Sequence, residues 1–287
     1  MSQVYEIQLT AAHAVTQLIA VKTGVPESMV GLFSDFETLL HALLEGKTQS
    51  PGRVVAGGLV TPDVQLAVHK ADRELVEIAG SSPFTTDLEG ILSAISTGDE
   101  VVYLANPNRG TGAGWLLGEL EQIANSVPKG MLIVDEFYHD FHGVSADPLL
   151  TRHTNVVILR SPVAAQVSQG DSGYLMSSPH LIDELRQTGA LAGVPESTLQ
   201  KLTECLYDSE QLYERLVVLH DEALRIVGEL SLAGFQCRLT PFDHLLIKVG
   251  DTASAGNYLA RHKISVENLD GYPGLKNHIR VQIQSQA

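Results

Sequence analysis

The sequence has few cysteines and no long hydrophobic run. Its 287 residues include two cysteines, Cys205 and Cys237, whose spacing matches no metal-binding motif and gives no disulfide framework. This scarcity is typical of a reducing compartment, so we expect a cytoplasmic protein. No run of about 18 apolar residues predicts a membrane span, and the first ten residues lack the pattern of a signal peptide.

Basic residues are also scarce. The chain has 19 Lys and Arg against 34 Asp and Glu, which gives a formal net charge of -15. Such a charge repels nucleic-acid backbones and anionic lipid surfaces, so neither is an expected partner. A hydrophobic share of 44% is enough for one large core, or for a large and a small one.

The middle of the chain alternates short β-rich runs with amphipathic stretches, and no repeat of 20 to 50 residues is visible. Residues 101–105, 131–134 and 155–159 are predicted strands, and the apolar spacing over residues 116–124 predicts a helix. Strands separated by helices favour an α/β fold with a mainly parallel sheet and helices on both faces.

The pattern changes after residue 178. We predict a large α/β domain over residues 1–178 and a smaller C-terminal α+β domain over residues 179–287. The elements expected in the second domain are helices at 199–206, 212–230 and 253–262, and strands at 235–239, 244–249 and 279–283.

Three segments, in this order and spacing, resemble the fold-type I aminotransferases, most closely the histidinol-phosphate branch. Residues 103–112 read Tyr-Leu-Ala-Asn-Pro-Asn-Arg-Gly-Thr-Gly, where the family has a strand leading into Asn-Pro-Asn-Asn-Pro-Thr-Gly. Residues 132–141 match an apolar strand followed by Asp-Glu-Ala-Tyr. Residues 156–164 match a strand followed by Arg-Ser and, three residues later, lysine.

The resemblance implies chemistry based on pyridoxal phosphate, in which a lysine forms a Schiff base and an aspartate keeps the pyridine nitrogen protonated. Asp135 matches that aspartate, and Tyr138 matches a donor to the ring oxygen. Arg280 matches the arginine that binds the substrate carboxylate. The alternatives are that Asp135 caps the turn after a strand and that Arg280 forms a salt bridge at the rim. The resemblance also implies a homodimer.

The departures from the family pattern are informative. Ala164 stands at the lysine position, so no Schiff base can form there. Arg109 replaces an asparagine that contacts the ring oxygen, and a charged guanidinium does not mimic a neutral amide. We therefore expect no covalently bound pyridoxal phosphate, and weak or absent binding of the free cofactor.

The phosphate-binding residues are also altered. Ser34 and Ser161 match two hydroxyls of the family's phosphate cup. Val163 replaces another hydroxyl, Ser172 replaces an arginine, and Val60 falls near the position of the aromatic residue that stacks on the cofactor ring.

A metal site is the less favoured interpretation of a nearby cluster. The residues that suggest it are Glu136, His139, Asp140, His142 and His153. Alternate residues after a strand point to different sides, and no HExxH or HxxEH helix is present. We expect no metal.

The sequence thus predicts an aminotransferase-like protein that has lost transamination. Its cleft, with Arg109, Asp135, Tyr138 and Arg280, could bind a small carboxylate. One alternative is an enzyme of amino-acid or secondary metabolism that uses the same cleft, either with pyridoxal phosphate bound non-covalently or with chemistry independent of it. Another is an interaction module whose cleft is filled by side chains.

Overall fold

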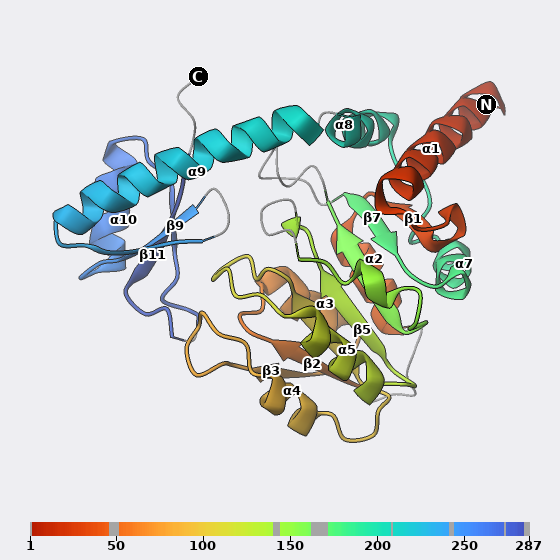
Figure 1. The fold of residues 1–287 in the computed structure, drawn as a ribbon, viewed down its shortest axis with the longest axis horizontal. Helices are drawn as coiled ribbons and strands as arrows, with labels where there is room; N and C mark the ends of the chain where they lie inside the picture. The colour runs from red at the N-terminus through yellow and green to blue at the C-terminus, as the bar shows by residue number, and fades with distance from the viewer. Residues whose placement is uncertain are drawn as a thin grey trace.

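The computed structural model describes residues 2–45, 52–139, 144–161, 172–207, 209–240, 244–272 and 274–283. Figure 1 shows how its helices and strands are arranged. In chain order they are α1 (Ser2–Thr23), the 3-10 helix η1 (Glu27–Met29), β1 (Val30–Phe33), α2 (Phe36–Glu45), β2 (Arg53–Gly57), α3 (Pro62–Lys70), β3 (Glu74–Ile78), α4 (Leu88–Ala94), β4 (Val101–Ala105), α5 (Leu117–Ser126), β5 (Met131–Asp135), the 3-10 helix η2 (Asp147–Leu149), β6 (Val156–Arg160), β7 (Gly173–Met176), α7 (Pro179–Thr188), α8 (Glu196–Tyr207), α9 (Ser209–Leu232), β8 (Gln236–Leu239), β9 (His244–Lys248), α10 (Thr252–Arg261), β10 (Val266–Asn268) and β11 (His278–Gln282).

Seven strands form the large sheet, in the order β1-β7-β6-β5-β4-β2-β3. The neighbours β3, β2, β4, β5 and β6 are parallel, whereas β7 runs antiparallel to both β6 and β1. The carboxyl ends of the five parallel strands therefore meet at one edge of the sheet. Ligand sites of open α/β sheets lie at this edge.

Helices cover both faces of the large sheet. On one face, α1, α4, α5 and α8 bury a cluster that includes Val102, Leu132 and Val156. On the other face, α2, α3 and α7 bury a cluster that includes Val54 and Met131. Apart from the edge strand β3, the strands are buried on both sides, which explains why their sequences are mainly hydrophobic runs that do not alternate.

The small sheet is antiparallel, in the order β10-β11-β9-β8. One of its faces packs on α9 and α10, with Ala223, Leu245 and Ile279 in the cluster between them. Leu246 of β9 belongs to a second cluster, with Leu269 and Leu275 from the segment between β10 and β11 and with Leu59 from the loop after β2. The long helix α9 runs from α8 beside the large sheet to the small sheet (Figure 1).

The predicted fold class is confirmed: the molecule is α/β, with a mainly parallel sheet between helices and a separate small sheet. The predicted strand at 155–159 lies one residue later, at Val156–Arg160. The domain boundary after residue 178 stays a prediction; α7 and α8, which follow it, pack on the large sheet.

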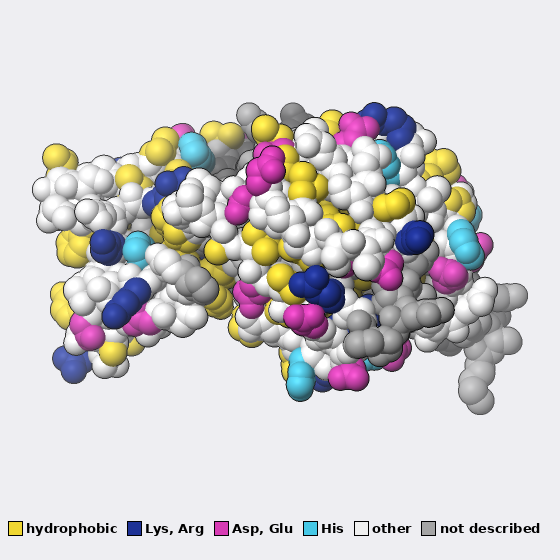
Figure 2. Space-filling model, turned by 90° about the horizontal axis from the view of Figure 1, so that it is seen from below, with side chains coloured by type: hydrophobic (Ala, Val, Ile, Leu, Met, Phe, Trp, Pro, Cys, Tyr) yellow, Lys and Arg dark blue, Asp and Glu magenta, His cyan; other side chains and the backbone are white. Residues whose placement is uncertain are grey.

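Among the described residues, every helix is too short or too polar to cross a lipid bilayer. On the face shown in Figure 2, Lys and Arg side chains are dispersed among acidic ones and do not gather into a basic patch.

Candidate functional site

Asp135 lies at the carboxyl end of β5, on the sheet edge where a site is expected. The hydroxyl of Tyr103, on the adjacent strand β4, donates a hydrogen bond of 2.5 Å to its Oδ2 atom. The backbone N–H of Phe137 donates to its Oδ1 atom at 3.0 Å. Burial raises the pKa of Asp135, while these two hydrogen bonds and the charge of Arg109 work in the opposite direction. These two hydrogen bonds thus hold the carboxylate of Asp135 in place as a hydrogen-bond acceptor at the carboxyl end of β5.

Arg109 is positioned by the loop that follows β4. The side chain of Asn108 organises this loop: its Oδ1 atom accepts from the N–H of Gly110 at 3.1 Å and from that of Thr111 at 3.3 Å. Its Nδ2 atom donates to the carbonyl of Leu59 at 2.8 Å. Because Asn108 is only 3% exposed, these bonds hold the loop firmly beside the end of β2.

The guanidinium of Arg109 lies over the ring of Tyr138, with its Cζ atom 5.8 Å from the ring centroid. This distance suits a cation–π contact. The Nε atom of Arg109 is buried and donates no hydrogen bond to any residue in the described part of the chain. An unsatisfied buried donor is costly, so this position favours an acceptor supplied by a ligand.

Arg280 lies on β11 of the small sheet. Its Nη1 atom donates to the backbone carbonyl of Arg109 at 3.2 Å. Its Nη2 atom forms an ion pair with Glu267, the residue opposite it on β10. Arg280 therefore joins the small sheet to the loop after β4, and its charge is already paired.

A cavity of about 230 Å³ lies between the loop that carries Arg109 and the part of the small sheet that carries Arg280. Its lining includes Arg109 and Arg280, the acidic residues Asp63 and Glu267, and Tyr272. The structure thus brings together two predicted site residues, Arg109 and Arg280, whereas Asp135 and Tyr138 do not line this cavity in the described structure. Its volume would hold only a small molecule.

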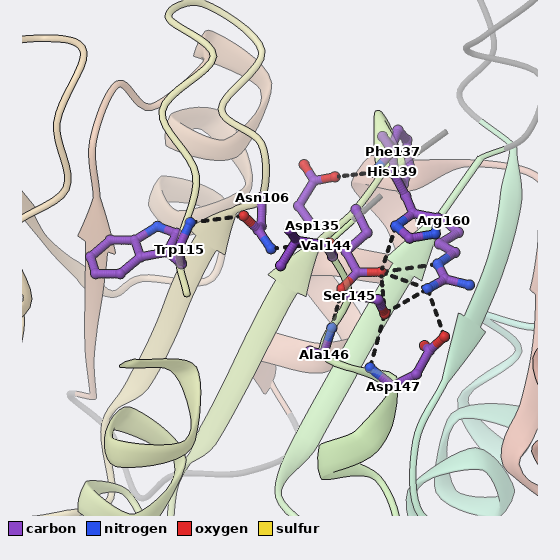
Figure 3. A network of polar contacts seen from close by, with 11 residues as sticks. Asn106, Trp115, Asp135, Phe137, His139, Val144, Ser145, Ala146, Asp147 and Arg160 are labelled. Atoms are coloured by element: carbon purple, nitrogen blue, oxygen red, sulfur yellow. Dashed lines mark hydrogen bonds and ion pairs between the residues drawn. The ribbon is translucent and has the colours of Figure 1, made fainter. Parts of the chain in front are cut away.

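A network of buried charges lies next to Asp135, at the ends of β5 and β6 (Figure 3). Arg160 donates to Glu136 through Nε at 3.0 Å and Nη2 at 2.8 Å. It also donates to the hydroxyl of Ser145 at 2.7 Å and to Asp147 at 2.9 Å. The N–H of Ala146 satisfies the other oxygen of Glu136 at 2.6 Å. This network fixes the segment that follows Asp135.

Sequence reasoning missed several of these residues. The sequence motifs contain Tyr103 and Glu136 but do not indicate that Tyr103 binds Asp135 or that Glu136 pairs with Arg160. Glu136 directly follows β5 and Arg160 ends β6, so their opposite charges meet because these two strands are parallel neighbours, which the structure shows. The role of Glu267 could not be recognised from the sequence, because its contact with Arg280 depends on the register of β10 and β11.

The two serines of the predicted phosphate cup lie near the same sheet edge. Ser34 follows β1 and is half-buried. Ser161 follows β6, is buried, and donates its hydroxyl to the carbonyl of Ser172 at 2.7 Å. Val60 lies in the core cluster of the large sheet. Ala164 and Val163 lie outside the described residues.

The metal candidates in the described part of the chain do not form one cluster. The Nδ1 atom of His139 lies 3.8 Å from Glu136, and His153 lies 3.5 Å from Glu121. Asp140 and His142 lie outside the described residues, and no group that could hold a metal occurs in the described part of the chain.

The cavity lining does not fit covalently bound pyridoxal phosphate. The cofactor aldehyde needs a lysine, and none of the described residues that line the cavity is one. Asp135 and Ser161, which match cofactor-binding residues of the family, are not among the described residues that line this cavity either. We therefore derive no chemical step through this cofactor.

Comparison with known proteins adds independent information. The family model "Aminotransferase class I and II" matches residues 12–283. Histidinol-phosphate aminotransferase 2 of Pasteurella multocida is 26% identical over 275 residues, which cover 93% of this chain and 74% of that protein. The aromatic amino acid aminotransferase of Thermobifida fusca is 27% identical over 254 residues, with 84% and 68% covered.

Solved structures have a similar fold. Histidinol-phosphate aminotransferase from Sinorhizobium meliloti, in complex with pyridoxal-5'-phosphate, superposes with a TM-score of 0.81 at 20% identity, covering 95% of this chain and 77% of that one. The histidinol-phosphate aminotransferase from Clostridium acetobutylicum gives 0.82 at 15% identity, with 94% and 83% covered.

Proposed function

Because this chain belongs to the class I and II aminotransferase family, we propose that it keeps the family's cleft but has lost transamination. In this proposal the cleft between the two sheets binds a small carboxylate, and the bound molecule is not transaminated. Arg109 and Arg280 supply the donors for the carboxylate.

One observation carries the proposal: the cavity is lined by two arginines, and its described lining contains no lysine. Without that amine there is neither a Schiff base nor a base to move the proton, and a positioned general base alone is worth about 10² to 10⁴ in rate. Ala164, which the resemblance places at the lysine position, supports the same conclusion. The buried Nε atom of Arg109, which has no acceptor among the described residues, provides a donor for such a ligand.

The second candidate is an enzyme that holds pyridoxal phosphate without a covalent bond. The observation that favours it is the position of Asp135, at the end of a parallel strand and within reach of Tyr103. In this case Asp135 would hold the ring nitrogen, and the cofactor would supply an electron sink.

The absorbance spectrum between roughly 300 and 500 nm, after incubation with pyridoxal phosphate and dialysis, separates the two candidates. We expect no retained band and no shift on borohydride treatment. A retained band that is lost in Asp135→Asn would support the enzyme instead. Exposed Asp183, replaced by Asn, is the control for the same change of charge far from the cleft.

Carboxylate binding has its own test. We expect calorimetric titration with succinate to show binding to the wild-type protein and a loss of at least roughly tenfold in affinity in Arg280→Gln. Equal affinity of both proteins would contradict a carboxylate site at Arg280.

We also propose that the chain forms homodimers, as the resemblance implies. Sedimentation velocity should then give the mass of two chains at micromolar concentration. A single species with the mass of one chain would contradict this proposal.

A further inference from the structure

The cleft contains a carboxylate of its own beside Arg280. Glu267 lies opposite Arg280 in the register of β10 and β11, so the two side chains emerge side by side from adjacent strands. Their ion pair joins Oε2 of Glu267 to Nη2 of Arg280, and both residues line the cavity. The pair thus occupies part of the donor surface that a ligand carboxylate would need.

The two side chains of this ion pair differ in solvent exposure and in their other contacts. The side chain of Arg280 is 10% exposed, and its Nη1 atom also donates to the carbonyl of Arg109 at 3.2 Å. The side chain of Glu267 is 40% exposed. Rotating Glu267 into water would break the ion pair without leaving a buried carboxylate, whereas moving Arg280 would also break a contact between the sheets. Glu267 is therefore the displaceable member.

Tyr272 supports Glu267 in its present position. Burial raises the pKa of Tyr272, and the adjacent negative charge of Glu267, to which it is hydrogen-bonded, raises it further. Tyr272 also lines the cavity. Glu267 is thus held between a cation and a hydroxyl donor, as a bound carboxylate would be.

The other charges that line the cavity affect how tightly a ligand carboxylate would bind beside Arg280. Asp63, at the start of α3, is exposed and adds a second negative charge to the lining. Asp63 and the displaced Glu267 would both repel a ligand carboxylate, so removing the charge of Glu267 would relieve part of this repulsion as well as release Arg280.

We propose that Glu267 is an internal competitor that occupies Arg280 and limits the affinity of the cleft for carboxylate ligands. This inference rests on the proposed function, because it concerns the same carboxylate site. A ligand carboxylate must displace Glu267 before Arg280 can bind it.

The test compares succinate binding to three full-length proteins by titration calorimetry. Glu267→Gln keeps the shape of the side chain and removes its charge. Glu229→Gln is the matched control, because Glu229 also pairs with an arginine, Arg225, but does so on the exposed surface of α9. We expect Glu267→Gln to bind succinate about tenfold more tightly than the wild type, and Glu229→Gln to bind it as the wild type does.

A second variant shows where the gain arises. Adding Arg280→Gln to Glu267→Gln should abolish the tightening, because the released guanidinium is then absent. Thermal unfolding of each variant checks that it is folded.

The outcomes separate this inference from the proposed function. If Arg280→Gln weakens succinate binding but Glu267→Gln does not strengthen it, the cleft binds carboxylates and Glu267 is no competitor, so this inference alone is wrong. A tightening that survives the removal of Arg280 would also refute it. If succinate binds neither the wild type nor Glu267→Gln, the carboxylate site of the proposed function is wrong, and this inference is wrong with it.

Discussion

Replacing Arg160 with methionine should make the stability of this protein depend strongly on pH. Glu136 is 1% exposed, and Arg160 is its cationic partner. Burial raises the pKa of Glu136 to about 7, and the charge of Arg160 works against that shift. In Arg160→Met the opposing charge is gone, so the pKa of Glu136 in the folded protein should rise further.

The size of the effect follows from the protonation of Glu136. Near pH 6 the raised pKa lets Glu136 of the variant hold a proton, so no unpaired charge is buried and the loss is mainly of hydrogen bonds, worth about 1–2 kcal/mol. A raised pKa in the folded state costs stability as the pH rises through it. Near pH 9 the variant must either bury an unpaired charge or keep the proton, and we expect a loss of about 3–5 kcal/mol.

Urea unfolding at the two pH values measures the difference directly. A second substitution, Glu136→Gln, in the Arg160→Met background should remove the dependence on pH, because no charge is left to bury. Arg225→Met is the control, since Arg225 pairs with Glu222 and Glu229 on the exposed face of α9. The reasoning is refuted if Arg160→Met loses the same free energy of unfolding at both pH values.

Three further predictions concern single side chains. Tyr103→Phe removes the 2.5 Å hydrogen bond to Asp135, so the free energy of unfolding in urea should fall by about 1–2 kcal/mol, and an unchanged value would contradict the role of this bond. Gly57→Ala would place a Cβ atom 2.6 Å from the Trp115 ring, and overpacking should cost about 1–3 kcal/mol, visible as a lower thermal midpoint. Leu246→Ala removes a side chain that is 1% exposed from the cluster between the two sheets; guanidinium unfolding should show a loss of about 2–5 kcal/mol, and a loss below 1 kcal/mol would mean that this contact does not hold the sheets together.

The fold was predictable from sequence because its strands are buried on both faces. The run at 101–105 has one local explanation, a strand in a covered parallel sheet, and β4 occupies it. Helix α5 was predictable because Leu120, Ile123 and Ala124 return to one side of the helix, and all three are buried.

The site was only partly predictable. The position of Asp135 follows from the end of a strand, but its partner Tyr103 depends on which strand lies next to β5. The pairing of Arg280 with Glu267 depends on a strand register between segments that are separated in sequence by a loop. A single sequence contains neither the register nor the order of the strands, because both follow from tertiary packing.

The order of strands in the large sheet has a consequence for biosynthesis. Among the described strands, β1 pairs only with β7, so the backbone of Val30 gains its strand partner, Met176, only after β7 has been synthesised. Because the chain is synthesised from its N-terminus, this apolar strand leaves the ribosome long before β7 does. Such distant contacts slow folding, so the nascent chain should be most prone to aggregate, and most in need of chaperones, before β7 emerges.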